Sequence, residues 1–189
     1  MTKPQLRTQI LSRREALSPE VRAEYSHKIT QTLTSLPQFL TAETIHCYLS
    51  FGTEVDTSEI RLAAFAAGKR VAIPILEKNT PILKHCIIQE HFEFTNGHWN
   101  VPVPTGIEVG LLSAEELAMT EKDIIIVPLV AFDKEKHRLG YGKGFYDRFL
   151  QHEKALKIGI AFSLQEVGQI PFESHDEVLS MIITENPQY

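Results

Sequence analysis

The sequence has few cysteines, no excess of positive charge and no long apolar run, and each absence excludes a class of protein. Its two cysteines, Cys47 and Cys86, form no Cys-x-x-Cys pair, so neither a disulfide framework nor a cysteine-rich metal site is expected. The net charge of -5 argues against sequence-independent nucleic-acid binding, which requires a basic face. No apolar stretch approaches membrane-spanning length, and the first residues lack a signal-peptide core. We therefore expect a cytoplasmic protein without nucleic-acid or membrane partners.

Three familiar site motifs are also missing. A Walker A loop needs Ser or Thr after its lysine, and Gly144 stands at that position. The dinucleotide fingerprint G-x-G-x-x-G fails because Phe145 occupies the place of its last glycine. The histidines show no spacing such as H-E-x-x-H, so a zinc site is not expected.

The most informative stretch that is present is Arg138–Arg148, with the sequence RLGYGKGFYDR. Its glycines at 140, 142 and 144 remove three Cβ atoms, so backbone N–H groups can approach an anion closely and positive φ angles are permitted. A helical pattern runs from Phe145 to about Leu156, and its N-terminal end would direct free N–H groups and a positive dipole end at the loop. The stretch is typical of a phosphate-binding loop, although a flexible glycine turn between strand and helix is the alternative.

The charged residues of this loop favour the phosphate-binding interpretation. Lys143 adds a point charge, and Arg138 adds a planar fork that suits phosphate oxygens. Asp147, one turn into the helix, could hold the magnesium ion that accompanies a nucleoside triphosphate. The plainer interpretation of Asp147 is that its charge favours the positive end of the helix.

The rest of the chain alternates apolar strand patterns with helical ones. Helices are predicted at about 3–16, 18–34, 56–68, 113–116 and 145–156, and strands at 44–49, 70–75, 82–89, 124–127, 157–162 and 179–184. The predicted caps are Ser18 before Pro19, a capping box beginning at Asp56, and a stop at Gly68. Residues 81–103 look like a hairpin or a small excursion over one face. We predict an α/β fold in which a mainly parallel sheet is flanked by helices on both faces, a Rossmann-like three-layer sandwich formed by residues 1–189 as a single domain.

Six segments, in order along almost the whole chain, make the sequence resemble one family. They are Lys3-x-x-x-Arg7, Tyr48–Ser50 followed by Glu54–Thr57, Trp99–Pro102, Val127–Asp133, Arg138–Asp147 and Pro171–Asp176. Together they resemble the 5-formyltetrahydrofolate cyclo-ligase family, also called methenyltetrahydrofolate synthetase. The match departs from the family at Phe145, where tyrosine is common, and over residues 80–99, which carry little recognisable pattern.

The resemblance implies an enzyme that uses ATP and Mg²⁺ to convert 5-formyltetrahydrofolate to 5,10-methenyltetrahydrofolate, releasing ADP and phosphate. Lys143 and Arg138 would be catalytic, because they suit the moving phosphoryl charge. The residues that would bind ATP are Lys3, Arg7, Arg138, Leu139, Gly140, Tyr141, Gly142, Lys143, Gly144, Phe145 and Tyr146. Without the resemblance, Lys3 and Arg7 would be assigned to a solvated helix face.

The resemblance also supplies a folate site and a metal site. The folate ligands would be Leu49, Glu54, Trp99 and Tyr146, where a carboxylate can accept pterin N–H groups and a flat ring can pack on the substrate. By themselves, Leu49 would be assigned to the core, Glu54 to an exposed loop and Trp99 to a surface anchor. Tyr146 is equally compatible with a core aromatic and a folate contact. Asp147 and Asp176 would hold the metal, and no oligomer beyond a monomer is expected.

Two other classes of function fit parts of the sequence. A sugar-phosphate isomerase or a related α/β enzyme would use a glycine-rich anion site without ATP, but it needs an acid–base pair that the loop does not offer. A ligand-sensing domain of a regulator would normally accompany a DNA-binding module, for which the chain has neither room nor basic charge.

Overall fold

The computed structural model describes residues 1–77, 80–97, 101–105, 110–173 and 176–186. Its helices are α1 (Lys3–Glu15), α2 (Pro19–Ser35), α3 (Pro37–Thr41), α4 (Ser58–Ala66), α5 (Ala114–Leu117), α6 (Phe145–Leu150) and the 3-10 helix η2 (Ser163–Gln165). Its strands are β1 (Thr44–Cys47), β2 (Arg70–Leu76), β3 (Leu83–Ile88), β4 (Phe94–Asn96), β5 (Pro102–Pro104), β6 (Ile124–Val127), β7 (Ala131–Phe132), β8 (Arg138–Leu139), β9 (Leu156–Ile160) and β10 (Met181–Ile183). None of the described helices is long and apolar enough to cross a bilayer.

A six-stranded sheet with the order β10-β9-β6-β1-β2-β3 forms the centre of the fold. The first five of these strands are parallel, and β3 joins the edge antiparallel to β2. The middle strand β6 is fully buried along its length, as expected for a parallel strand that is covered on both faces. From β1, the chain extends the sheet to one side with β2 and to the other with β6. The crevice at the carboxyl ends of β1 and β6 is therefore the switch point where ligands bind in such sheets.

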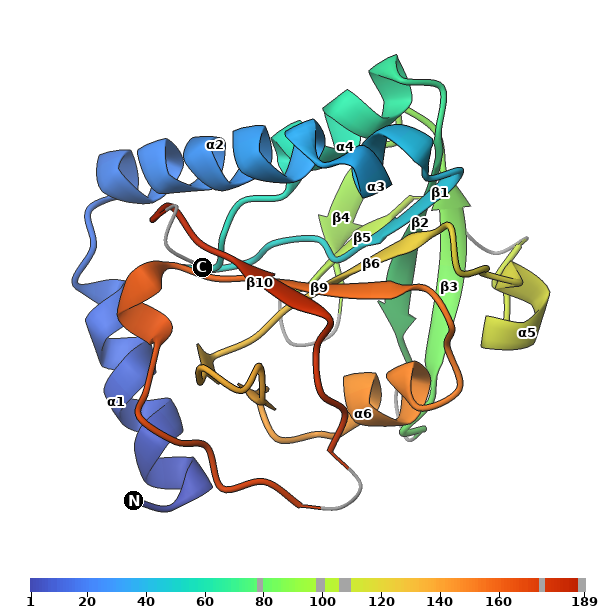
Figure 1. Ribbon diagram of the computed structural model, residues 1–189. Coiled ribbons are helices and arrows are strands. Elements are labelled where there is room, and N and C mark those ends of the chain that lie inside the picture. The colour runs from blue at the N-terminus through green and yellow to red at the C-terminus, as the bar shows by residue number, and fades with distance from the viewer. Residues whose placement is uncertain (78–79, 98–100, 106–109, 174–175, 187–189) are drawn as a thin grey trace.

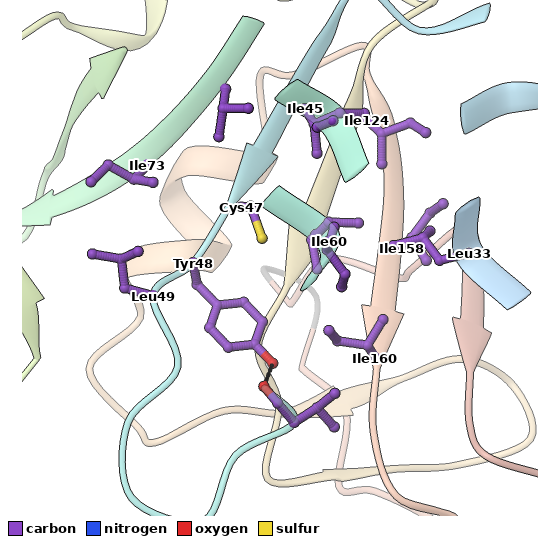
Figure 2. Close-up of a cluster of buried hydrophobic side chains, with 14 of the residues drawn as sticks. Leu33, Ile45, Cys47, Tyr48, Leu49, Ile60, Ile73, Ile124, Ile158 and Ile160 are labelled. Atoms are coloured by element: carbon purple, nitrogen blue, oxygen red, sulfur yellow. Dashed lines mark hydrogen bonds between the residues drawn. The ribbon is translucent and has the colours of Figure 1, made fainter. Parts of the chain in front are cut away.

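Helices cover both faces of the sheet, which confirms the predicted fold class. On one face, Leu33 of α2 and Ile60 of α4 pack against isoleucines of β1, β6 and β9 (Figure 2). On the other face, Phe149 and Leu150 of α6 pack on Ile125 of β6 and its neighbours. In Figure 1 the sheet lies between α2, α3 and α4 on one side and α6 on the other. Helix α1 lies outside these layers, where it packs against β7, β8 and the 3-10 helix η2.

Several local signals are confirmed. Ser18 caps α2 by accepting the Val21 N–H, and Gly68 ends α4 in the left-handed region at a φ of 69°. Three other predictions need correction. The cap of α4 is Thr57 without a side-chain cap bond, because the Thr57 hydroxyl donates instead to Tyr48 O at 2.7 Å. Asp56 accepts from the N–H and hydroxyl of Ser58.

The other two corrections concern α6 and β3. Helix α6 ends at Leu150, well before the predicted end at 156, because Leu156 is required in the sheet, where its N–H donates to Asp123 O at 2.9 Å. The strand predicted at 82–89 joins the main sheet as β3, and the later strands of this region, β4 and β5, pair with each other in a separate two-stranded sheet. Only the later part of the excursion expected over 81–103 therefore leaves the main sheet.

One polar pair is buried among the apolar side chains of the second face. His46 of β1 and His85 of β3 are both fully buried, and their Nε2 and Nδ1 atoms are 3.1 Å apart. The His46 Nδ1 and His85 Nε2 atoms have no hydrogen-bond partner among the described residues. Burial lowers the pKa of His85 to about 4 and that of His46 well below its ordinary value. The pair is therefore neutral at physiological pH.

Candidate functional site

A cavity of about 410 Å³ lies beyond the carboxyl ends of β1, β2 and β6. Apart from Trp99, which is outside the described residues, every predicted site residue lines it: Lys3, Arg7, Leu49, Glu54, Arg138, Leu139, Gly140, Tyr141, Gly142, Lys143, Gly144, Phe145, Tyr146, Asp147 and Asp176. Leu49 follows β1, the glycine loop follows β8, and Lys3 and Arg7 come from α1. The two ends of the chain therefore meet at one site.

The glycine loop is held against α1 by a hydrogen bond from an α1 side chain to the loop backbone. The Arg7 Nε donates to the carbonyl oxygen of Gly140 at 2.7 Å. Gly142 has a φ of 94°, and a Cβ there would lie 3.0 Å from the Arg7 guanidinium carbon. Gly144 has a φ of 69°, and a Cβ there would lie 2.8 Å from Arg148 Nη1. Glycine is thus favoured at 142 and 144 by the positive φ at both positions, and the ends of the two arginine side chains would have to shift to admit a Cβ. A Cβ at Gly140 would meet no atom within 4 Å.

Four cations line the cavity around the loop (Lys3, Arg7, Arg138 and Lys143), and three of them have protein partners. The Lys3 ammonium lies 2.8 Å from Asp176 and 2.8 Å from Glu173. Arg138 is buried, and it donates to Asp147 and to the carbonyl oxygen of Glu177. The exposed Lys143 ammonium makes no hydrogen bond or ion pair with any residue that the structure describes. Positive charge therefore converges on the loop, and Lys143 is available to a ligand.

The two predicted metal-binding carboxylates line the same cavity, but each is already paired with a cation. Asp147 accepts from Arg138, and Asp176 accepts from Lys3 and from the Glu173 N–H. No cluster of three or more His, Cys, Asp or Glu side chains suited to a metal occurs in the described part of the chain. Two carboxylates beside a phosphate loop fit a Mg²⁺ ion that also takes phosphate oxygens and waters. They do not fit a metal held by the protein alone.

The other half of the cavity is apolar, with one acid. Leu49, Leu83 and Pro128 line it, together with the aromatic rings of Tyr48 and Tyr146. The Tyr146 hydroxyl is buried and has no hydrogen-bond partner among the described residues. A buried hydroxyl without a partner is costly, so this one is suited to a polar group of a ligand. Flat apolar walls with a few convergent polar groups are typical of small-molecule sites.

Glu54 is the acid of this half, and its carboxylate is held by two hydrogen bonds. The Phe51 N–H donates to one oxygen at 3.1 Å, and the Tyr141 hydroxyl donates to the other at 2.9 Å. Tyr141 in turn accepts from Arg14 Nη2 at 2.8 Å. Burial raises the pKa of Glu54 to about 7, although the Phe51 N–H, the Tyr141 hydroxyl and the Arg14 charge each lower it. Its proton therefore titrates near neutral pH.

Sequence reasoning missed Arg14 and most of the apolar wall, apart from Leu49 and Tyr146. Arg14 is only 3% exposed, and it lies on the buried face of α1 with Leu6 and Ile10. An arginine in the i, i+4, i+8 register of an apolar stripe was the available signal. The other wall residues carried no comparable signal, because apolar residues at or near strand ends look alike in sequence. They are Tyr48, Phe51, Pro74, Leu76, Leu83, Val101 and Pro128.

A sequence profile of the 5-formyltetrahydrofolate cyclo-ligase family matches residues 1–185. The chain belongs to this family. It is 34% identical over 182 residues to the 5-formyltetrahydrofolate cyclo-ligase of Escherichia coli (strain K12), covering 93% of this chain and 96% of the relative. It is 31% identical over 190 residues to that of Mus musculus, covering 96% and 92%.

Two solved structures with related folds extend the match to three dimensions. An NMR structure of the Aquifex aeolicus 5,10-methenyltetrahydrofolate synthetase superposes with a TM-score of 0.80 at 30% identity, covering 98% of this chain and 90% of that one. The Mycoplasma pneumoniae 5,10-methenyltetrahydrofolate synthetase gives 0.77 at 27% identity, covering 98% and 100%. The family fold therefore extends over nearly the whole chain.

Proposed function

We propose that this protein catalyses the ATP-dependent cyclisation of 5-formyltetrahydrofolate to 5,10-methenyltetrahydrofolate, and that residues 1–189 act as one domain. The observation that carries the proposal is a single cavity with two unlike halves. One half is a cationic glycine loop that suits a triphosphate, and the other is an apolar pocket with one carboxylate that suits a pterin. A phosphoryl donor and a flat heterocycle would thus meet in one site, as membership of the family leads us to expect.

The reaction needs a phosphoryl donor because the formyl oxygen is a poor leaving group. That oxygen attacks the γ-phosphorus of ATP, a new O–P bond forms, and the bond to ADP breaks. The folate N10 then attacks the activated formyl carbon, its proton is lost, and inorganic phosphate leaves with the former formyl oxygen. The products are ADP, phosphate and the methenyl bridge, so atoms and charge balance. Most of the catalysis comes from positioning and from stabilising phosphoryl charge.

The residues around the loop have distinct tasks in this proposal. Arg7 holds the loop through Gly140 O, so the loop N–H groups face the phosphates in a fixed arrangement. Lys143, which lacks a protein partner among the described residues, neutralises the transferring phosphoryl group. Arg138 presents a guanidinium that Asp147 and the Glu177 carbonyl already orient, which suits a charge that must not move during the reaction.

Folate binds in the apolar half in this proposal. Glu54 accepts N–H groups of the pterin, and the Tyr146 hydroxyl takes a polar atom of the substrate in place of its missing partner. Leu49 and the neighbouring wall exclude water from the formyl carbon. Asp147 and Asp176 would hold Mg²⁺, which when bound neutralises charge on the phosphates. An isomerase of sugar phosphates would have no use for the apolar half.

The decisive experiment follows ATP and folate in the same reaction. The full chain is incubated with ATP, Mg²⁺ and 5-formyltetrahydrofolate, and the methenyl chromophore and released phosphate are both recorded. We expect equal amounts of the two products, and neither when ATP or the folate is omitted. A folded protein that binds ATP and forms no methenyl product would contradict the proposal. Phosphate release that does not depend on folate would indicate a different ATP-using reaction.

A further inference from the structure

Arg14, Tyr141 and Glu54 form a hydrogen-bonded chain that links α1, the glycine loop and the apolar half of the cavity. Arg14 Nε donates to the Thr53 hydroxyl at 3.0 Å, and its Nη2 donates to the Tyr141 hydroxyl at 2.8 Å. The Tyr141 ring packs on the Phe51 ring, with centroids 5.6 Å apart. Arg14 is almost fully buried, so its charge serves this chain rather than the solvent.

The donor and acceptor roles in the chain are fixed by chemistry. A guanidinium has no acceptor, so the Tyr141 oxygen must accept from Arg14. The Tyr141 proton is then directed to Glu54 Oε1, 2.9 Å away, while the Phe51 N–H occupies Oε2. Both carboxyl oxygens therefore accept a hydrogen bond, an arrangement that favours the ionised carboxylate over the protonated acid.

We propose that Arg14 and Tyr141 are positioning residues that keep Glu54 ionised and directed at the folate. This inference rests on the proposed function. The chemical reason for the proposal is that a pterin presents N–H donors. An ionised carboxylate accepts hydrogen bonds with both oxygens, whereas a protonated carboxyl group uses one oxygen to carry its proton. Because Tyr141 belongs to the nucleotide loop, the same loop that would hold the phosphates also sets the state of the folate acid.

Other groups near Glu54 cannot replace this chain. Burial raises the pKa of the Tyr48 and Tyr146 phenols well above the ordinary value, so both stay neutral. Across the 50–56 segment, Glu54 also borders a second cavity of about 280 Å³, whose charged residues are Arg22 and Asp56. The remaining cations of the main cavity are Lys3, Arg7, Arg138 and Lys143. Among the charges around Glu54, only that of Arg14 lowers its pKa.

The test first measures the titration of the Glu54 carboxyl group and then the pH dependence of folate binding. In protein labelled with ¹³C at the glutamate side-chain carboxyl, the Glu54 signal is assigned with Glu54→Gln and titrated without ligand. We expect its midpoint to move to higher pH in Tyr141→Phe, which keeps the ring packing, and in Arg14→Gln. Arg14→Lys should return it part of the way. Arg13→Gln, an exposed neighbour on the same helix, is the matched control and should leave the midpoint unchanged.

Calorimetric binding of 5-formyltetrahydrofolate without ATP is then measured from about pH 5.5 to 8.5. Tyr141→Phe should weaken binding about tenfold near pH 7, the scale for losing a hydrogen bond to a charged group, and move the acid limb of the profile upward. Equal weakening at every pH with an unmoved Glu54 midpoint would overturn the proposal. Wild-type protein that titrates as expected but binds no folate would instead refute the proposed function. Tyr141→Phe keeps the test valid if Arg14→Gln does not fold.

Discussion

Replacing Gly142 with alanine tests whether the glycine loop is shaped by its contact with α1. At a φ of 94°, a residue with a Cβ is strained by about 1–3 kcal/mol. The new Cβ would also lie 3.0 Å from the Arg7 guanidinium carbon. That guanidinium would have to withdraw by a few tenths of an ångström, which would weaken its 2.7 Å bond to Gly140 O, a further cost of up to about 1.5 kcal/mol for a weakened bond from a charged donor. Together these terms predict a loss of about 1–4 kcal/mol in the free energy of unfolding.

Gly140→Ala is the matched control, because it adds the same methyl group two residues away. No atom lies within 4 Å of that Cβ position, and the φ of Gly140 is not in the left-handed region. Its free energy of unfolding should change by about 0.5 kcal/mol or less. Urea unfolding gives both values, and calorimetric titration with ATP gives the nucleotide affinity, which should fall in Gly142→Ala because Arg7 is displaced. Equal stability and equal ATP affinity in the two variants would refute this account of the loop.

Three further predictions concern the charges of the site and the buried histidines. Lys143→Ala should lower turnover about a hundredfold and leave 5-formyltetrahydrofolate affinity nearly unchanged; near wild-type initial rates would show that Lys143 is only a solvated loop residue. Arg7→Ala should raise the ATP concentration needed for half-maximal rate, whereas Arg13→Ala should not; the same ATP dependence in both would remove Arg7 from the nucleotide site. The free energy of unfolding should fall as the pH drops from about 6.5 toward about 4, because the unfolded chain binds protons that buried His85 and His46 do not. Urea midpoints of a variant with both histidines replaced by leucine should fall less over this range, and an equal fall would show that the pair does not titrate in this way.

Local signals were enough for much of the fold. Ser18 before Pro19 and the glycine at 68 act on their immediate neighbours, so the sequence alone located those ends. The apolar run 124–127 predicted a buried parallel strand, which is the middle strand β6. The early end of α6 was not predictable in this way, because the helical pattern continues past Leu150 and only pairing of Leu156 with β6 decides where the helix must stop.

In the candidate site, too, some features were predictable from the sequence and others only from the tertiary structure. The sequence by itself determined the family, the glycine loop and the set of cations and acids that could meet there, because residue types and spacing carry that information. Only the tertiary structure decided which of them touch: Lys3 and Asp176 are far apart in the chain yet 2.8 Å apart in space. It also decided that glycine is needed for backbone reasons at 142 and 144 but not at 140. The Tyr141 hydroxyl donates to Glu54 and accepts from Arg14, because α1 packs across the loop. Such packing depends on the whole chain rather than on any local pattern.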